Sequence, residues 1–271
     1  MKKDYKEYYH FKNKKWIWGI LWPSLLYIGL SIIIGIIGGI MAGIYAAMHD
    51  INAMDIALSG TFNLSLNMVV QILTIAVCLP IYLYNRKHYY SKPKNKPSIK
   101  LIIFSICFVL LISVPLDYLL TYIKNNYIGE TKLDLVNQLI SDANIYITIL
   151  SATIIAPIVE ELMLRGLTLN KALSRTNTIK AILISSIIFG ILHMNLIQGI
   201  FAFLIGIPLA LVFIKTKSII PCILCHLANN LIAVFQMNIS SKGYLISNIV
   251  IIVITIIPAY LFIKEKEIDY N

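Results

Sequence analysis

Charged residues are scarce in this sequence, and their scarcity excludes a soluble globular fold. Only 13% of the 271 residues are charged, whereas 58% are hydrophobic. About a quarter of the residues of a soluble domain are charged, so much of this apolar surface has to face lipid. Low-complexity segments, internal repeats and a separate polar domain are also missing. The chain is therefore expected to be all-α, a polytopic membrane helix bundle.

Long apolar runs are near the roughly 20 residues that cross a hydrocarbon core about 30 Å thick. They predict about eight transmembrane helices, of which the first is long enough to tilt or bend and the fifth is short. The first run is too long for the hydrophobic part of a cleavable signal peptide, so it is expected to be an anchor. A polar segment between the third and fourth spans, Thr131–Asp142, has apolar residues at helical spacing and predicts a short interfacial helix. The predicted spans are Ile17–Ala47, Leu66–Tyr84, Leu101–Ile123, Ile145–Leu169, Ile179–His193, Leu196–Ile214, Ile219–Met237 and Tyr244–Ile263.

The net charge of +10 does not indicate a nucleic-acid partner, because the basic residues alternate between loops. Most of the 23 Lys and Arg residues lie in the N-terminal tail, after the second span, or after the fourth, sixth and eighth spans. This is the positive-inside pattern, which predicts a multi-pass cell-membrane protein with both termini in the cytoplasm. Abundant Ile, Lys, Asn and Tyr indicate an AT-rich bacterial genome. The exceptions to the alternation are Lys124, Lys132, Arg165 and Lys242.

Buried charges divide the chain into three parts. Residues 1–144 are predicted to form the N-terminal tail, three spans and the interfacial helix. Residues 145–240 hold the charged motifs, and residues 241–271 form the last span and a cytoplasmic tail. Within the fourth span, Glu160, Glu161 and Arg165 place three charges in six residues. Each charge costs at least about 2.5–3.5 kcal/mol in hydrocarbon, so each needs a partner inside the bundle.

Helix geometry predicts how these charges pair. Glu161 and Arg165 are four residues apart with the acid first, which places them on one helix face in the favourable order. Glu160 points about 100° away on a helix of 3.6 residues per turn, so it needs another partner. A carboxylate held in this way is suited to act as a general base. The alternative is that all three residues only join helices together.

Two histidines provide candidate partners in later spans. His193 ends the fifth span, and His226 lies inside the seventh, with Asn230 four residues further on the same helix face. Counted at about 1.5 Å per residue from the cytoplasmic ends, Glu160, His193 and His226 reach depths compatible with one cavity. The other histidines lie in the tail and loops, where a surface role is expected: His10, His49 and His88.

Three motifs therefore follow one another on separate spans: Glu160-Glu161-x3-Arg165, Phe189-x3-His193 and His226-x3-Asn230. In this order they resemble the motifs of the CAAX-protease and bacteriocin-processing family, which contains type II prenyl-protein endopeptidases and Abi-type membrane proteases. The resemblance covers residues 145–240. It implies an intramembrane endopeptidase that cuts a peptide near a hydrophobic or lipidated segment, such as a prenylated C-terminus, a bacteriocin leader or a signalling peptide.

The resemblance also implies roles for the motif residues. The first glutamate of the first motif and the histidine of the second would hold and deprotonate a water molecule. The histidine and asparagine of the third motif would stabilise the oxyanion that forms when this water attacks a peptide carbonyl. The second glutamate and the arginine would shape the site. The candidate catalytic residues are Glu160, Glu161, Arg165, His193, His226 and Asn230.

A metal ion is an open alternative at this site. If Zn²⁺ is bound, Glu160, His193 and His226 would be its ligands, with one position left for water. The sequence lacks H-E-x-x-H, and no two histidines in a span are four residues apart. Chemistry without a metal, in which glutamate activates water directly, is the favoured expectation.

Other interpretations remain beside the protease. A non-catalytic membrane scaffold, or a self-immunity or regulatory protein, would need none of the six residues. Inverted repeats in the sequence would favour a transporter, but they are missing. A lipid-modifying transferase is a weaker alternative. The expected partners are a peptide or lipidated-protein substrate and the lipid bilayer.

Two further patterns concern small residues. Gly35, Gly39 and Gly43 are four residues apart in the first span, which favours close helix packing inside the bundle or, alternatively, a homodimer or contact with another membrane partner. Cys222-x2-Cys225-His226 fits a haem-attachment motif, but it lies well inside an apolar helix, where attachment is not expected.

Overall fold

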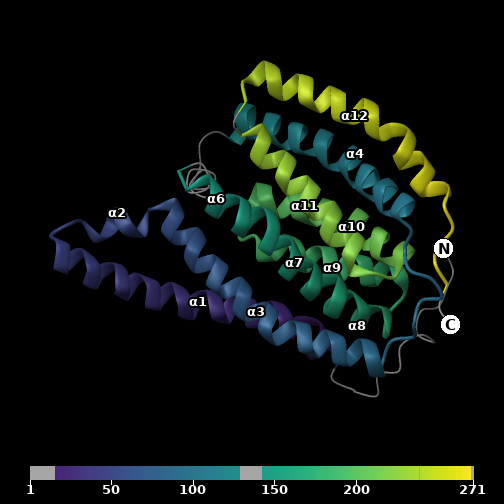
Figure 1. The fold of residues 1–271 in the computed structure, drawn as a ribbon, viewed down its shortest axis with the longest axis horizontal. Helices are drawn as coiled ribbons and strands as arrows, with labels where there is room; N and C mark the ends of the chain where they lie inside the picture. Colours follow the sequence, from purple (N-terminus) through teal and green to yellow (C-terminus); the bar gives the residue numbers. More distant parts are fainter. Residues whose placement is uncertain (1–15, 129–141, 238, 270–271) are drawn as a thin grey trace.

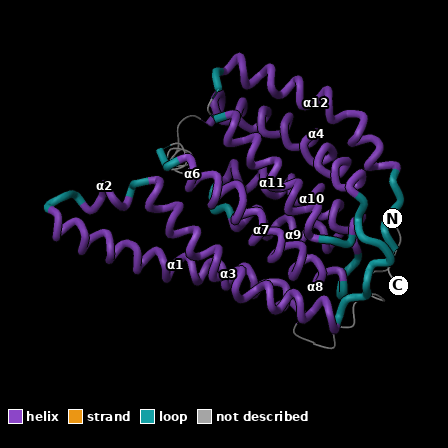
Figure 2. The backbone as a smooth tube through the Cα atoms, viewed as in Figure 1, coloured by secondary structure: helices purple, strands orange, loops and turns teal. Residues whose placement is uncertain are grey.

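The computed structural model describes residues 16–128, 142–237 and 239–269, which form a bundle of helices joined by short loops (Figures 1 and 2). No strand occurs in these ranges. Three stretches, marked η, are π-helical. The elements are α1 (Trp16–His49), α2 (Ala53–Ala57), α3 (Gly60–His88), α4 (Ile99–Ile123), η2 (Lys124–Ile128), α6 (Ile145–Thr148), η3 (Ile149–Ile155), α7 (Ala156–Glu161), η4 (Leu162–Leu169), α8 (Asn170–Leu173), α9 (Thr178–Leu192), α10 (Leu196–Thr216), α11 (Ile219–Gln236) and α12 (Ser241–Lys264).

The predicted membrane architecture is confirmed. Within the described ranges, seven helical segments are long and apolar enough to cross a membrane, with the run Ile145–Leu173 counted as one segment. The shorter apolar helix α9, of 15 residues, lies where the short fifth span was predicted, and an eighth crossing there stays a prediction. The protein is thus an all-α, multi-pass membrane protein. The interfacial helix predicted at Thr131–Asp142 lies outside the described residues, apart from Asp142.

The helices run back and forth between two ends of the bundle. α1 and α3 pair on one side, α4 and α12 pair on the other, and α7, α9, α10 and α11 lie between them (Figure 1). α1 begins at one end of the bundle, and α3 and α12 finish at the same end. We call this end the terminal end. The opposite end, where α3 begins and α4 finishes, is called the cavity end, for the reason given below.

Serine and asparagine side chains begin most of the helices. In each case the side-chain oxygen accepts a hydrogen bond from a backbone N–H two or three residues later, which satisfies one of the free donors of the first turn. These caps fix where the chain re-enters the bundle after each short loop. They are Asn52, Ser59, Ser98, Asn144, Asn177, Asn195, Ser218 and Ser240.

The fourth crossing, from Ile145 to Leu173, is not a regular α-helix. Its α-helical piece α7 lies between the π-helical stretches η3 and η4. Pro157 lacks an N–H, and its ring disfavours the preceding α-helical turn. The carbonyl of Ala152, five residues earlier, therefore loses its π-helical donor and instead accepts a hydrogen bond of 2.9 Å from Asn230 Nδ2 of α11. π-Helical turns are rare and often occur at functional sites.

The backbones of α9 and α10 approach each other closely near the charged motifs. A Cβ atom at Gly199 would lie 2.9 Å from the backbone oxygen of Gly190, which cannot move aside as a side chain can. We expect Gly199→Ala to destabilise the fold by about 1–3 kcal/mol, as overpacking usually does. Gly39→Ala is the matched control, because a Cβ there meets nothing within 4 Å among the described residues.

Thermal unfolding of the detergent-purified variants measures this difference. A lower midpoint for Gly199→Ala, with no loss for Gly39→Ala, is the expected result. Equal midpoints for the two variants would show that the α9–α10 backbones are not held in this close contact.

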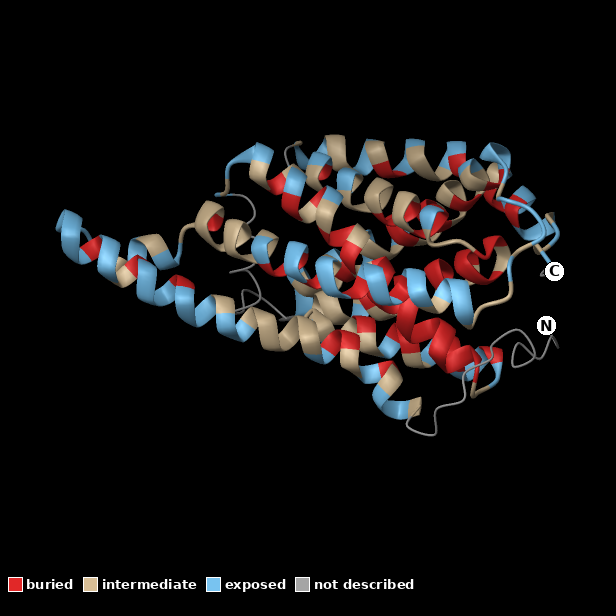
Figure 3. Cartoon of the chain, turned by 60° about the horizontal axis from the view of Figure 1, so that its bottom comes forward, coloured by how far each residue is buried: buried red, intermediate tan, exposed pale blue. Residues whose placement is uncertain are grey.

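The glycines of α1 do not pack as expected. No described atom outside the helix lies within 4 Å of a Cβ built at Gly35, Gly39 or Gly43, so packing inside the bundle is wrong for these positions. The neighbouring Gly38 makes the close approach instead, against Leu66 of α3. α3 thus crosses a different face of α1, and the far part of α1 is largely exposed (Figure 3). Homodimerisation through the three glycines stays a prediction.

Candidate active site

The predicted ion pair between Glu161 and Arg165 forms, and both side chains are completely buried. Arg165 Nη1 donates a hydrogen bond of 2.9 Å to Glu161 Oε1. Arg165 Nη2 donates to the carbonyl of Gly206 on α10 at 2.9 Å, and its guanidinium carbon lies 5.1 Å from the centre of the Phe189 ring. This cation–π contact adds to the charge pairing. The arginine therefore connects the fourth crossing to α9 and α10 from inside the bundle.

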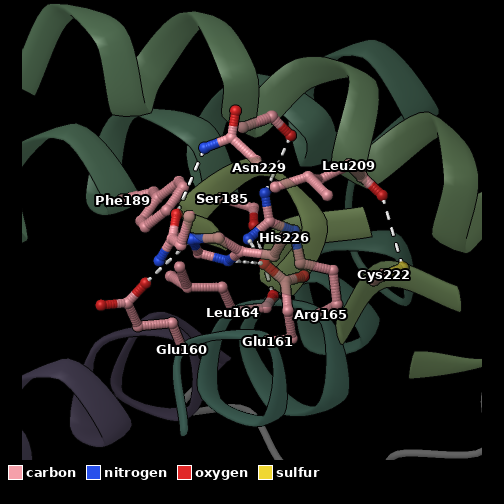
Figure 4. Close-up of polar contacts among 12 residues, drawn as sticks. Glu160, Glu161, Leu164, Arg165, Ser185, Phe189, Leu209, Cys222, His226 and Asn229 are labelled. Carbon is pink, nitrogen blue, oxygen red and sulfur yellow. Dashed lines mark hydrogen bonds and ion pairs between the residues drawn. The ribbon is translucent and has the colours of Figure 1, made fainter. Parts of the chain in front are cut away.

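His226 of α11 lies between the two glutamates of the first motif (Figure 4). Its Nδ1 is 3.0 Å from Glu161 Oε1, and its Nε2 is 3.5 Å from Glu160 Oε2. An ionised carboxylate only accepts hydrogen bonds, so Nδ1 is the donor to Glu161. The unassigned partner that Glu160 was expected to need is thus His226. Glu160, His226, Glu161 and Arg165 form one polar row across three elements.

Burial is graded along this row. The side chains of Glu161 and Arg165 are 0% exposed, that of His226 is 7% exposed, and that of Glu160 is 21% exposed. Glu160 is therefore the member of the row that can meet a substrate or water. The three buried members fix its surroundings.

His193 is positioned by its own helix and by Phe189. Its Nδ1 lies 2.9 Å from the Phe189 carbonyl, and since a carbonyl only accepts, Nδ1 donates and Nε2 is left for another partner. The Phe189 ring meets the rings of His193 and His226 edge-on, with centroids 5.0 and 5.6 Å apart. Met194 follows with a left-handed backbone, φ 49°, so the chain reverses directly after His193.

Asn230 joins α11 to the interrupted fourth crossing. Its Nδ2 holds the Ala152 carbonyl, and its Oδ1 accepts a hydrogen bond of 3.2 Å from Asn229 Nδ2. One amide proton of Asn230 is therefore used to hold two helices together. The donor role that the family resemblance implies for Asn230 rests on the other amide proton and stays a prediction.

A cavity of about 1050 Å³ lies beside this polar row. The chemically active part of its lining is formed by Glu160, His193, His226, Asn229 and Asn230. The structure thus brings four of the six predicted catalytic residues to one cavity, whereas Glu161 and Arg165 lie behind them. Among the described contacts, none joins Glu160 directly to His193. The cavity also has apolar walls, which include Phe189, Ile197, Phe201, Ile205 and Ile232.

Sequence reasoning missed polar residues that α3 and α4 contribute to the cavity. Asn63, Asn67 and Gln71 of α3 line it at four-residue spacing. Asp117 of α4 also lines it, and its Oδ2 accepts a hydrogen bond of 2.6 Å from the Tyr244 hydroxyl. Amide side chains repeated every fourth residue mark one face of a helix. This spacing was visible in the sequence and could have identified the face.

The three predicted zinc ligands have other contacts in this structure. Both ring nitrogens of His226 face carboxylates, and one ring nitrogen of His193 is bonded to the Phe189 carbonyl. In the part of the chain that the structure describes, no three His, Cys, Asp or Glu side chains come together as metal ligands do. Binding of Zn²⁺ at these three residues stays a prediction, and the mechanism proposed for this chain uses its own side chains alone.

The haem-attachment pattern is also unsuited to its chemistry. Cys222 and Cys225 are completely buried within α11, and all four cysteines are free. Covalent attachment needs accessible thiols. The pattern is a consequence of small buried residues packing beside His226.

The fold and the site define a polytopic membrane protein with a buried Glu–His–Glu–Arg row beside a large internal cavity. A family model described as "Type II CAAX prenyl endopeptidase Rce1-like" matches residues 142–232, the segment that holds all three motifs. This segment of the chain is similar to the CAAX-protease family, in agreement with the resemblance of its motifs.

A curated relative supports the same family. The chain is 33% identical over 97 residues to the Bacillus subtilis (strain 168) protein named "Putative membrane peptidase YdiL". The match covers 36% of this chain and 40% of that relative. No solved structure matches the chain.

Proposed function

We propose that this protein is an intramembrane endopeptidase, which hydrolyses a peptide bond near a hydrophobic or lipidated segment of its substrate. The observation that carries the proposal is the position of Glu160, which is partly exposed at a cavity inside the bundle and contacts His226. The family match to residues 142–232 supports the same chemistry.

Glu160 is the proposed general base. Its carboxylate takes a proton from a water molecule in the cavity, and the resulting hydroxide attacks the peptide carbonyl carbon. His193, whose Nε2 is left as an acceptor, lines the same cavity and helps to orient this water. A positioned base of this kind contributes about 10²–10⁴-fold to the rate.

His226 and Asn230 are the proposed donors to the oxyanion. His226 Nδ1 already donates to Glu161, so the ring donates to the oxyanion only when Nε2 is protonated as well. Glu160 Oε2, 3.5 Å from Nε2, can supply the proton that it took from water. When the tetrahedral intermediate collapses, the C–N bond breaks and this proton goes to the leaving amine. The products are a carboxylic acid and an amine.

The walls of the cavity suit an apolar segment beside a polar peptide bond. Aromatic and aliphatic side chains of α9, α10 and α11 line it together with the asparagines. These apolar walls lower the local dielectric constant, which strengthens the electrostatic contacts at the reacting atoms. A substrate with a hydrophobic or lipidated segment would bury that segment here.

Cleavage of a panel of quenched fluorescent peptides, with and without an attached lipid, tests the proposal on detergent-purified protein. We expect the wild type to cleave at least one peptide. His193→Ala and His226→Ala should each lower kcat/KM by about 100-fold or more. His88→Ala is the control, because His88 is exposed at the end of α3.

The same assay separates the alternatives. Activity that survives a chelator is expected, whereas activity lost on chelation and restored by Zn²⁺ would replace the metal-free mechanism. If no peptide is cleaved and the histidine variants keep the protein's effect in cells, the protein is a non-catalytic scaffold or immunity protein instead.

A further inference from the structure

The cavity is built from one end of the bundle. Most of its lining comes from the first parts of α3, α10 and α12 and from the later parts of α4, α9 and α11, and the middle of the fourth crossing adds Ala152, Ala156 and Glu160. Because successive helices run in opposite directions, these first and later parts lie at the cavity end. Exposed residues such as Asn125 and Ser241 belong to the lining, so the cavity reaches the surface there.

The fourth crossing is tightly packed between the site and the terminal end. Every residue from Glu161 to Ser174 is buried, and this run continues the fourth crossing from Glu160 toward the terminal end. The Glu161–Arg165 pair lies in its first part and is bonded to α10 through the Gly206 carbonyl. A substrate approaching from the terminal end would meet this packed layer.

The residues that follow α12 are fixed across the terminal end. Glu265 pairs with Lys100 at 2.8 Å, and Glu267 pairs with Lys217. The hydrogen bond from Lys100 and its charge hold the pKa of the partly exposed Glu265 carboxyl below its usual value. The backbone N–H of Lys94 donates to the Asp269 carbonyl at 2.8 Å. These contacts connect α12 to the α3–α4 loop, to α4 and to the end of α10.

The charge pattern relates these two ends to the membrane faces. The basic residues of the described loops concentrate at the terminal end, after α3, α8, α10 and α12. Asp50, Asp55 and Asp142 lie at the opposite end of the spans. By the positive-inside rule the terminal end faces the cytoplasm, so the cavity end faces the other side.

We propose that the active site is entered from the extracytoplasmic face of the membrane, and that the substrates are peptide segments presented at that face. This inference rests on the proposed function for the chemistry, but its geometry does not depend on cleavage. It favours exported peptides, or the extracytoplasmic ends of membrane segments, over the lipidated C-termini of cytoplasmic proteins.

Cysteine labelling in intact cells tests the access side. Asn125→Cys and Ser241→Cys place thiols at the cavity end, and Asn95→Cys places one in the exposed α3–α4 loop at the terminal end. A charged, membrane-impermeant maleimide should label the first two in intact cells and label Asn95→Cys only after permeabilisation. The wild type, with its four native cysteines, gives the background. The reverse labelling pattern would overturn the inference.

Sealed vesicles of known orientation separate this inference from the proposed function. A membrane-impermeant peptide that the protein cleaves in detergent should be cleaved by right-side-out vesicles and spared by inside-out vesicles. Cleavage by inside-out vesicles alone would overturn the access side and leave the protease intact. If no peptide is cleaved in detergent, the proposed function fails, while the labelling result still decides which face the cavity meets.

Discussion

Glu160→Gln is expected to abolish peptide cleavage while leaving the fold intact. The amide has the size and shape of the carboxyl group but cannot accept a proton from water, so the loss falls on the chemical step. We expect kcat/KM to fall by about 10²–10⁴-fold, the usual contribution of a positioned general base. Glu160 is 21% exposed at the cavity, and His226 keeps its contact with Glu161 in the variant, so the buried part of the row is unchanged.

The matched control is Glu265→Gln, which removes a partly exposed carboxylate at the terminal end, away from the cavity. Cleavage rates at several peptide concentrations, with unfolding midpoints measured on the same preparations, separate catalysis from folding. A Glu160→Gln protein that keeps more than half of the wild-type rate would remove Glu160 from the mechanism. A protein with a much lower midpoint would show instead that Glu160 is structural.

The membrane fold could be predicted because its signals are local. Apolar runs of membrane length and alternating loop charges specified the helices almost completely. The boundaries were less accurate where a helix is polar on one face. α3 begins at Gly60 rather than at Leu66, because Asn63 and its neighbours face the cavity and lowered the apolar signal.

The charged site was only partly predictable for a related reason. The Glu161–Arg165 pair follows from four-residue spacing within one segment. The contacts of His226 with Glu160 and Glu161 depend on where α11 crosses α7, and spacing within either segment does not determine that crossing. The π-helical stretches around Pro157 also shift the side chains from regular α-helical angles.

Removing the positive charge of Arg165 should have the largest effect on stability. Arg165→Met leaves Glu161 fully buried without its guanidinium partner, and breaking a buried pair in this way costs about 3–5 kcal/mol. Glu161→Gln should also be strongly destabilising, because it leaves Arg165 charged inside the bundle and weakens the bond to His226. Lys96→Met, in an exposed loop, is the control and should change stability by no more than about 0.5 kcal/mol.

The double variant Glu161→Gln, Arg165→Met gives the sharper measurement. Glu161 Oε2 and Arg165 Nε are buried without hydrogen-bond partners among the described residues, so the native pair is itself incompletely compensated. Removing both charges together should therefore recover more than half of the stability that Arg165→Met loses. Thermal unfolding of the wild type, the two single variants and the double variant in one detergent measures the coupling between the two side chains in stability. Additive losses would mean that the two side chains act independently, and His226 would then be the group that holds Glu161.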